Sequence, residues 1–357
     1  MVRFSDIIKT KGKKGETGKP PEPAKQGKGF RLSDSWFFKS RNLDTLSPKK
    51  VLRRASSFEA ESFYHSFVDR ARETGQWVKN DMQISPSPIL SDLHAVVERD
   101  LIDSLYKYVM SVKNEAEDIF THTVDVTFTS LKIGKGMNYD IKMMLKLGLA
   151  AFLENVGMYK IPEDILSVKG KLSESDLTLI RKHPETSYDL LMTLGDRYTW
   201  LAEAALSTHE RADGSGYPSG LKEAEIPELS AVIGLADIYC AMIRNRPYRD
   251  KFMQTDAVNS IIQADRWKFP SRVLKIFLNQ ISLFPVNSYV KLNNGHIGRV
   301  LFTARRHPLS PVVEILYNDK QEKLDERKEI SLTDDPLLYI ESWIDPDELV
   351  QEGGPID

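Results

Sequence analysis

Three of the seven histidines in this chain of 357 residues fall in one central stretch of helical pattern: His122, His183 and His209. His183 precedes a proline at a helix break, and His209 ends a helix that leads into a glycine-rich loop. Such positions direct side chains into a shared space, and imidazoles are common ligands of divalent transition metals. On spacing alone, a metal site and unrelated structural histidines remain open alternatives. The other four are isolated and are interpreted as surface or core residues (His65, His94, His296 and His307).

The segment from His209 to Leu221 reads His-Glu-Arg-Ala-Asp-Gly-Ser-Gly-Tyr-Pro-Ser-Gly-Leu. It strongly resembles the signature loop of the HD-GYP family, whose members are helical, metal-dependent cyclic di-GMP phosphodiesterases. Other motifs follow in the family's order: Leu147–Gly157, Lys160-Ile-Pro, Gly170-Lys-Leu-Ser, Lys182-His-Pro-Glu, Ala236-Asp-Ile-Tyr and Asn245-Arg-Pro-Tyr-Arg. The resemblance covers about residues 115–282 and implies an all-helical fold there.

The resemblance implies a chemistry in which two or three iron- or manganese-type ions lie between helices, held by imidazoles and carboxylates. The ions bind the scissile phosphate, neutralise its charge and activate a water. In the family an adjacent His and Asp bind one ion and bridge two, but this chain has Glu154 and Asn155 at those positions. Three more positions depart from the family pattern: Met158 replaces a phosphate-contacting Lys, Thr208 replaces the first His of a pair, and Cys240 stands where Asp is common.

Five candidate metal ligands are carried over by the resemblance: His122, Glu154, His183, His209 and Asp237. Asp118, four residues before His122 and on the same helix face, could add a carboxylate. Asn155 offers one neutral carbonyl oxygen and cannot bridge two cations, whose repulsion needs an anion between them. We therefore expect at most one tightly bound divalent ion, iron or manganese. The alternative is that Glu154 takes the bridging position.

The loop and two nearby arginines supply the candidate nucleotide contacts: Arg211, Gly214, Gly216, Tyr217, Pro218, Arg246 and Arg249. Glycines let the backbone approach a ligand, and arginines could meet phosphates with paired donors. The tyrosine could stack on a guanine. The alternative is a structural turn with the arginines in internal ion pairs. The predicted partners are cyclic di-GMP and, because the family's loop is a suspected contact surface for them, diguanylate cyclase (GGDEF) domains.

The composition, 41% apolar and 28% charged, is typical of a soluble globular protein. The longest apolar run, near Leu147–Leu153, is far shorter than the roughly 20 residues that cross a bilayer. The N-terminus lacks the apolar core of a signal peptide. A single cysteine excludes an intrachain disulfide and a multi-cysteine metal site. We expect a cytoplasmic protein.

Residues 1–56 hold 15 Lys and Arg against 5 Asp and Glu, although the net charge of the chain is −2. Such a basic tail could contact nucleic acid, anionic lipid or the acidic remainder of the chain. However, Lys11–Lys28 is rich in Gly, Pro and Lys and cannot bury enough apolar surface to fold. We interpret residues 1–50 as a disordered tail and expect no nucleic-acid partner.

The elements that must position these side chains follow from the hydrophobic periodicity, which predicts a mainly α protein. Residues 56–113 form an N-terminal helical module, with a restart after Pro86 for which Ser91 is the candidate N-cap. Residues 114–282 form the HD-GYP-like domain, in which Ser173-Glu-Ser-Asp predicts a capped helix start. The predicted helices of this domain span residues 118–133, 140–155, 173–180, 189–194, 200–208, 230–243, 255–264 and 271–281.

Near Phe284 the pattern changes to short, β-branched and partly alternating segments around residues 288–292, 298–302 and 312–316. Asn294-Gly295 predicts a tight turn between the first two. We interpret residues 284–345 as a small β-barrel-like module and residues 346–357 as a flexible tail.

Three functions remain open. The chain could be an active cyclic di-GMP phosphodiesterase, a catalytically silent relative that binds nucleotide or partner proteins, or a one-metal phosphohydrolase on another substrate. Loss of the bridging Asp, the paired His and the Lys favours the catalytically impaired or inactive relative. The retained ligands keep the two enzyme functions open.

Overall fold

The structure is a computed structural model that describes residues 57–111, 118–166, 172–244, 254–281, 284, 288–303, 310–335 and 337–344. The predicted basic tail, the C-terminal residues 346–357, Arg246 and Arg249 lie outside the described residues. The chain divides into two compact units. The first holds residues 1–251 and 266–273, and the second holds residues 252–265 and 274–357. Within the described residues, no helix combines the length and apolar character needed to cross a membrane.

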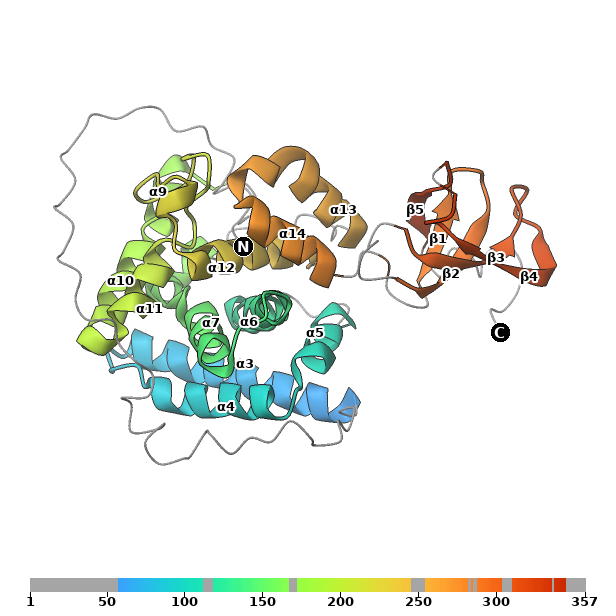
Figure 1. Cartoon of the computed structure of the whole chain (residues 1–357). Coiled ribbons are helices and arrows are strands. Elements are labelled where there is room, and N and C mark those ends of the chain that lie inside the picture. The colour runs from blue at the N-terminus through green and yellow to red at the C-terminus, as the bar shows by residue number, and fades with distance from the viewer. Residues whose placement is uncertain are drawn as a thin grey trace. The chain divides into compact units, whose positions relative to one another are not determined.

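The first unit opens with helices that pack around two buried ones. The outer helices are α3 (Ser57–Lys79), α4 (Pro86–Glu98) and α5 (Ile102–Ser111), and the buried ones are α6 (Ile119–Gly136) and α7 (Ile141–Leu153). Helices α3 and α5 contact α6, and α4 contacts α7. In Figure 1, α3 and α4 accordingly run below α6 and α7. Residues that were predicted to form an N-terminal module therefore pack directly on the helices that carry candidate ligands.

Helix starts in this unit depend on local chemistry. Asp118 and Asp140 cap α6 and α7 by accepting hydrogen bonds from backbone N–H groups of the first turn. The prediction that Ser91 caps a helix is wrong, because α4 already begins at Pro86 and Ser91 lies inside it. Proline fits the first helical position, where its missing N–H has no partner in any case.

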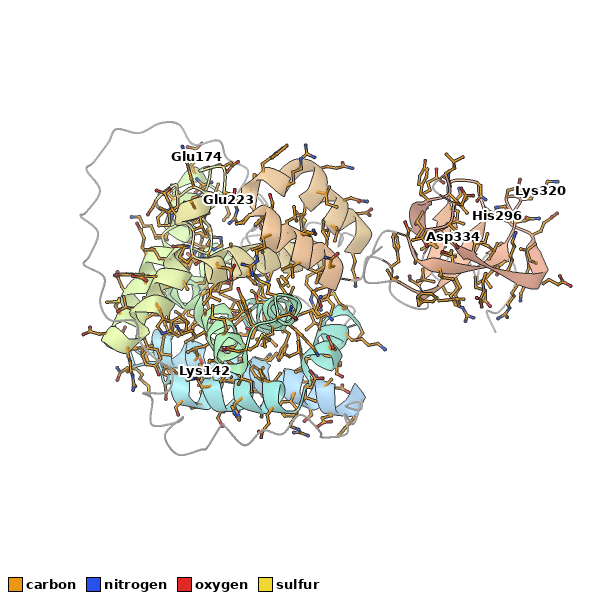
Figure 2. The ribbon with its side chains drawn as sticks, in the orientation of Figure 1. Lys142, Glu174, Glu223, His296, Lys320 and Asp334 are labelled. Carbon is orange, nitrogen blue, oxygen red and sulfur yellow. The ribbon has the colours of Figure 1, made fainter. Side chains whose placement is uncertain are left out.

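Shorter helices and one long helix complete the first unit. They are α8 (Glu163–Leu166), α9 (Glu174–Ile180), α10 (His183–Met192), α11 (Thr199–Leu206) and α12 (Glu228–Ile243). The predicted cap at Ser173 is confirmed, since its hydroxyl oxygen accepts a hydrogen bond from the Asp176 N–H at 3.1 Å. Helix α12 is buried from Leu229 to Met242 and contacts α6 and α7. Figure 2 shows the side chains that fill the space between these helices.

The segment after residue 253 changes helix type along its length. It contains α13 (Gln254–Ser260), a π-helical turn (Ile261–Asp265), a 3₁₀ turn (Arg266–Lys268) and α14 (Ser271–Gln280). The helix predicted over 255–264 is therefore α-helical only as far as Ser260. Pro270 follows shortly, and the residue before a proline is disfavoured in helical conformation.

The second unit contains a five-stranded antiparallel sheet in the order β4-β3-β2-β1-β5. Its strands are β1 (Tyr289–Leu292), β2 (Ile297–Phe302), β3 (Val312–Tyr317), β4 (Lys323–Ser331) and β5 (Ile340–Ile344). The predicted turn at Asn294-Gly295 joins β1 to β2, and Gly295 has a φ of +86°, a left-handed conformation that favours glycine. Among the described residues, β4 and β5 are the two edge strands of the sheet.

Two strands were not predicted. β4 reads Lys-Leu-Asp-Glu-Arg-Lys-Glu-Ile-Ser, in which only Leu324 and Ile330 are apolar, so it lacks the two-residue apolar alternation that predicts a strand. It is an edge strand that pairs with β3, and charges on an edge strand oppose pairing with other chains. β5 returns from a turn to pair with β1. Its place in the sheet comes from a long-range pairing that local pattern does not report.

Candidate functional site

Helices α6 and α12 bring together the first two predicted ligands. The Nε2–H group of His122 donates to Oδ1 of Asp237 across 2.8 Å, and both side chains are buried. Burial alone would raise the pKa of Asp237. The hydrogen bond and the charge of His122 outweigh it, so the pKa of this carboxyl lies below its usual value. An ionised oxygen donor thus lies in the interior against an imidazole.

Asp118, by contrast, does not join this site. Its Oδ1 accepts hydrogen bonds from the N–H groups of Phe120 at 3.0 Å and Thr121 at 2.7 Å. Its other oxygen lies 3.7 Å from a guanidinium nitrogen of Arg72. The carboxylate that could have added to the ligand set is instead the N-cap of α6, and it positions His122 by fixing where that helix begins.

The other two histidines contact each other. The Nδ1–H of His183 donates to the backbone carbonyl of Ile180 at 2.7 Å, which leaves Nε2 as the acceptor of the neutral ring. The Nε2–H of His209 donates to that atom at 2.9 Å. Burial lowers the pKa of His183 to about 4 and that of His209 well below its usual value, so both rings are neutral. A ring whose second nitrogen binds a backbone carbonyl is the usual arrangement of a metal-binding histidine.

Asp237 connects the two pairs. Its Oδ2 lies 3.9 Å from Nδ1 of His209, while its Oδ1 holds His122. His122 and His209 therefore lie beside one carboxylate and His183 contacts His209, although the three histidines come from α6, the start of α10 and the turn after α11. A hydrogen bond helps to hold α10 against the turn that follows α7: the hydroxyl oxygen of Ser187 accepts it from the Gly157 N–H at 2.9 Å.

Glu154 and Asn155 follow α7 and are both buried. The amide Nδ2 of Asn155 donates to Oε1 of Glu154 at 2.5 Å. Burial, and next the negative charge of Asp237, raise the pKa of Glu154 well above its usual value, while His122 acts in the opposite direction. These influences show that Glu154 lies within electrostatic reach of the His122–Asp237 pair.

The candidate ligands, which are imidazole nitrogens and carboxyl oxygens, are of the types that bind a divalent cation. Oε2 of Glu154 and Oδ2 of Asp237 are buried and accept no hydrogen bond from any described residue. Buried carboxyl oxygens that accept no hydrogen bond are costly, and a cation would satisfy them. However, no three His, Cys, Asp or Glu side chains in the described ranges form a ready-made ion-binding group. The candidate ligands contact one another in pairs, so these pairs would have to separate for an ion to bind between them.

The departures from the family pattern have structural roles outside this donor set. Met158 packs in an apolar cluster with Ile161 and Ile180. The Thr208 hydroxyl donates to the carbonyl of Ala204 at 3.0 Å, one helical turn earlier. The Cys240 sulfur lies 3.3 Å from the hydroxyl of Thr129. None of these three contacts involves a candidate ligand.

The glycine-rich loop folds back on its own start. The Glu210 carboxylate accepts hydrogen bonds from the N–H groups of Ser219 at 2.7 Å and Leu221 at 2.9 Å. Gly214 has a φ of +79°. A Cβ on Gly216 would lie 2.4 Å from the Arg211 nitrogen, so only glycine fits there. The loop is thus held by its own polar groups and by close backbone packing.

The structure places Arg211 and Tyr217 against protein groups. Arg211 is 2% exposed, and its Nη1 donates to the carbonyls of Thr208 at 3.1 Å and Glu210 at 2.6 Å. Its guanidinium lies 5.4 Å from the ring centroid of Phe269. The expected phosphate contact by Arg211 is therefore not available in this arrangement. The ring of Tyr217 stacks on His209, while Pro218 is exposed.

Sequence reasoning missed a buried ion pair beside the site. Arg244, which ends α12, lies 2.5 Å from a carboxylate oxygen of Asp125 on α6. Tyr64 on α3 donates its hydroxyl to the same carboxylate at 2.9 Å. A charged residue in the buried face of a predicted helix was the available signal. Of the isolated histidines, His296 lies in the turn before β2, in the second unit (Figure 2).

The chain is similar to known protein families and to individual proteins of known name. Residues 101–272 match the family model described as HD domain, and residues 289–352 match the KOW domain associated with HD domain. The chain is 27% identical over 212 residues to the cyclic di-GMP phosphodiesterase PA4108 of Pseudomonas aeruginosa, covering 59% of this chain and 50% of that protein. It is 30% identical over 215 residues to the cyclic di-GMP phosphodiesterase PdeB of Borreliella burgdorferi, covering 60% of this chain and 56% of that protein.

A solved structure is also similar. It is that of Bd1817, a HDG"Y"P protein from Bdellovibrio bacteriovorus, with a TM-score of 0.53 and 19% identity, covering 64% of this chain and 73% of that chain. At that identity the likeness shows the fold. The chain spans about half the length of the two curated relatives. Residues 101–272 thus form an HD domain, and the curated relatives, the solved structure and the signature loop make this chain similar to HD-GYP proteins.

Proposed function

We propose that this chain is a catalytically impaired HD-GYP relative that binds at most one divalent ion and acts through cyclic di-GMP or partner proteins. The observation that supports this most is the pair Glu154 and Asn155. Asn155 is uncharged, and its amide nitrogen is engaged by Glu154. The position that bridges two ions in the family therefore offers a single neutral carbonyl oxygen here.

Electrostatics explains why this matters. Two dications held close together repel strongly at low effective dielectric, and a bridging anion offsets that repulsion. A divalent ion supplies charge neutralisation for a phosphate and polarises its oxygen, whereas a two-ion site also holds the attacking and leaving oxygens together. Without the bridging anion we expect the site to lose the ability to hold the attacking and leaving oxygens together. Charge neutralisation and polarisation of a phosphate oxygen require only one ion, which the remaining ligands could bind.

The residues that would hold one ion are the buried donors around Asp237. His122 and His209 flank its carboxylate, and Glu154 lies within electrostatic reach. His183 already has the backbone hydrogen bond that orients a metal-binding ring. Imidazole and carboxylate donors together suit iron or manganese. We propose iron or manganese as the bound metal.

The loop supports a binding role more than a phosphate-gripping one. On its inner side, Glu210 and Arg211 form hydrogen bonds with backbone groups of the protein and are not available to a phosphate. Its outer residues Asp213, Ser215 and Ser219 are exposed. We propose this outer face as the contact surface for a GGDEF-domain partner. Cyclic di-GMP is proposed as the nucleotide because the curated relatives are named for it.

The test uses the full chain purified without oxygen. Metal content is measured by mass spectrometry, nucleotide binding by calorimetry, and hydrolysis by chromatography of the products. The nucleotides are cyclic di-GMP and 3'3'-cGAMP, since a further relative from Vibrio cholerae, 34% identical over 149 residues and covering 42% of this chain and 34% of that protein, is named a 3'3'-cGAMP-specific phosphodiesterase. We expect at most one ion per chain and very slow or undetectable turnover of either nucleotide.

An active phosphodiesterase is the second candidate, and one observation favours it. The free oxygens of Glu154 and Asp237 are both buried without hydrogen-bond donors from described residues, so Glu154 could swing to bridge two ions. Two ions per chain, together with turnover near the typical enzyme rate of roughly ten per second, would establish this function and reject the impaired one.

A further inference from the structure

The interface between α6 and α12 contains a buried ion pair that is separate from the candidate ligands. The Nε–H of Arg244 donates to Oδ2 of Asp125 at 2.6 Å, and a second guanidinium nitrogen lies 2.5 Å from the same oxygen. Asp125 is 1% exposed and Arg244 is 7% exposed. Removing charges from water is expensive, so such a pair persists only where its geometry is well satisfied.

Tyr64 completes the geometry from a third helix. Its hydroxyl donates to Oδ1 of Asp125 at 2.9 Å, so both carboxylate oxygens of Asp125 are engaged. Burial is the largest influence on Asp125 and raises its pKa to about 6, with Arg244 next and opposing it. The three residues join α3, α6 and α12 through one carboxylate.

This cluster lies on the helices that carry His122 and Asp237. Asp125 follows His122 by three residues on α6, and Arg244 follows Asp237 by seven residues at the end of α12. Asp125 thus lies close to one helical turn from His122, and Arg244 is the C-cap of the helix that carries Asp237. Cys240 and Thr129 make another contact across the same interface, at 3.3 Å. The interface is therefore fixed by directional polar contacts.

We propose that Asp125 and Arg244, braced by Tyr64, are positioning residues that hold α6 and α12 at the spacing at which His122 and Asp237 meet. Apolar helix contacts permit small sliding, whereas a hydrogen-bonded ion pair weakens steeply when its distance or angle changes. The proposal rests on the proposed ion site for its consequence in metal affinity. Its structural part concerns the His122–Asp237 hydrogen bond and requires no ion.

The experiment compares three variants of the full chain. Tyr64→Phe removes one hydrogen bond and keeps the ring. Asp125→Asn with Arg244→Gln removes both charges together, because removing one alone would leave the other buried and unpaired. The matched control is Tyr139→Phe, which removes the 2.5 Å hydrogen bond from Tyr139, just after α6, to Glu228 at the start of α12. The control therefore removes a contact between the segment that follows α6 and the start of α12.

The first readout is the ring nitrogen signal of His122 by NMR in chelator, assigned with a His122→Asn variant. The second is Mn²⁺ affinity, measured by electron paramagnetic resonance of the free ion. We expect the double variant to shift the His122 signal and to weaken Mn²⁺ binding by about tenfold, the lower end of the range for partners of metal ligands. We expect Tyr64→Phe to do both to a smaller extent, and Tyr139→Phe to do neither. If the double variant does not fold, Tyr64→Phe carries the same test.

The outcomes separate the two proposals. A His122 signal and Mn²⁺ affinity that are unchanged in Tyr64→Phe and in the folded double variant would overturn the positioning role. So would a control that shifts the signal as much as the double variant does. A shifted His122 signal in a protein that binds no Mn²⁺ would support the positioning role and overturn the proposed ion site.

Discussion

The ring of Tyr217 lies parallel to that of His209, with 5.0 Å between the ring centroids and 2° between their planes. The Tyr217 hydroxyl oxygen is buried and has no hydrogen-bond partner in the part of the chain that the structure describes. The face that could have stacked on a guanine is thus occupied by a candidate ligand. The tyrosine of the signature loop forms one wall of the site.

Tyr217 variants test this relationship through stability. Tyr217→Phe keeps the stacked ring and removes an unpaired buried hydroxyl, so we expect the free energy of unfolding to stay the same or rise by up to about 1 kcal/mol. Tyr217→Leu loses the aromatic pair and should lower it by about 1 kcal/mol. Urea unfolding in chelator measures both. A Phe variant less stable than the Leu variant would show that the hydroxyl makes a contact the stacked arrangement does not explain.

The pH dependence of stability follows from His183. Burial lowers the pKa of its imidazole to about 4, against about 6.5 in an unfolded chain. As the pH falls, the unfolded chain binds this proton first, so stability present above about pH 6.5 is lost progressively toward about pH 4. The loss is about 3 kcal/mol from this group.

His183→Gln isolates that contribution. The raised pKa of Glu154 acts with the opposite sign, because the folded state then takes up the proton first, but Glu154 is present in both proteins. Unfolding in urea across this pH range, with chelator, should therefore show a shallower decline for the variant. Equal slopes would mean that His183 is already solvated or charged in the folded protein.

Restoring the family's pair should restore metal and activity together. Glu154→His with Asn155→Asp returns a bridging carboxylate and a terminal imidazole, and we expect metal content to rise from at most one ion toward two, with faster cyclic di-GMP hydrolysis. Asn155→Asp alone should help less, because it places a second carboxylate where the amide now donates to Glu154 at 2.5 Å. Metal analysis and a hydrolysis assay, both on protein purified without oxygen, measure the metal content and the activity of each variant. A single variant that outperforms the double one would contradict the bridging argument.

Two glycines of the loop provide a graded stability test. A Cβ at Gly216 would lie 2.4 Å from both the Arg211 nitrogen and the Glu210 Cα, whereas the nearest atom to a Cβ at Gly214 is 3.5 Å away. Gly214→Ala should cost about 1 kcal/mol through its left-handed backbone alone. Gly216→Ala should cost about 3 kcal/mol, because backbone must move. Thermal unfolding ranks them, and equal costs would show that the loop is not packed on its start.

The fold was predictable wherever local chemistry decides it. The cap at Ser173 and the turn at Asn294-Gly295 follow from residue type, and both are confirmed. Ser91 failed as a cap because a proline upstream had already started the helix. β4 and β5 were missed because their pairing is long-range and their sequences are charged or irregular.

The candidate site was predictable only as a set of donors. Which atoms meet depends on packing that residue types do not encode. Asp118 has the right type and spacing for a ligand, yet backbone N–H groups claim its carboxylate. Arg211 has the right type for a phosphate, yet it is buried against carbonyl groups. Asp125 and Arg244 were not expected at all, since a buried ion pair appears only when two distant segments are brought together.

The burial of Arg211 bears on how such a loop is inherited. Its guanidinium donates to the carbonyls of Thr208 and Glu210, and it lies over Phe269. A substitution at this position would leave carbonyl groups and an aromatic ring without their partner, so we expect it to destabilise the fold whether or not the protein is active. A lineage could therefore lose its bridging carboxylate and still transmit the signature loop unchanged. In such a lineage the loop is retained for folding, and we expect activity to depend on the two residues that follow α7.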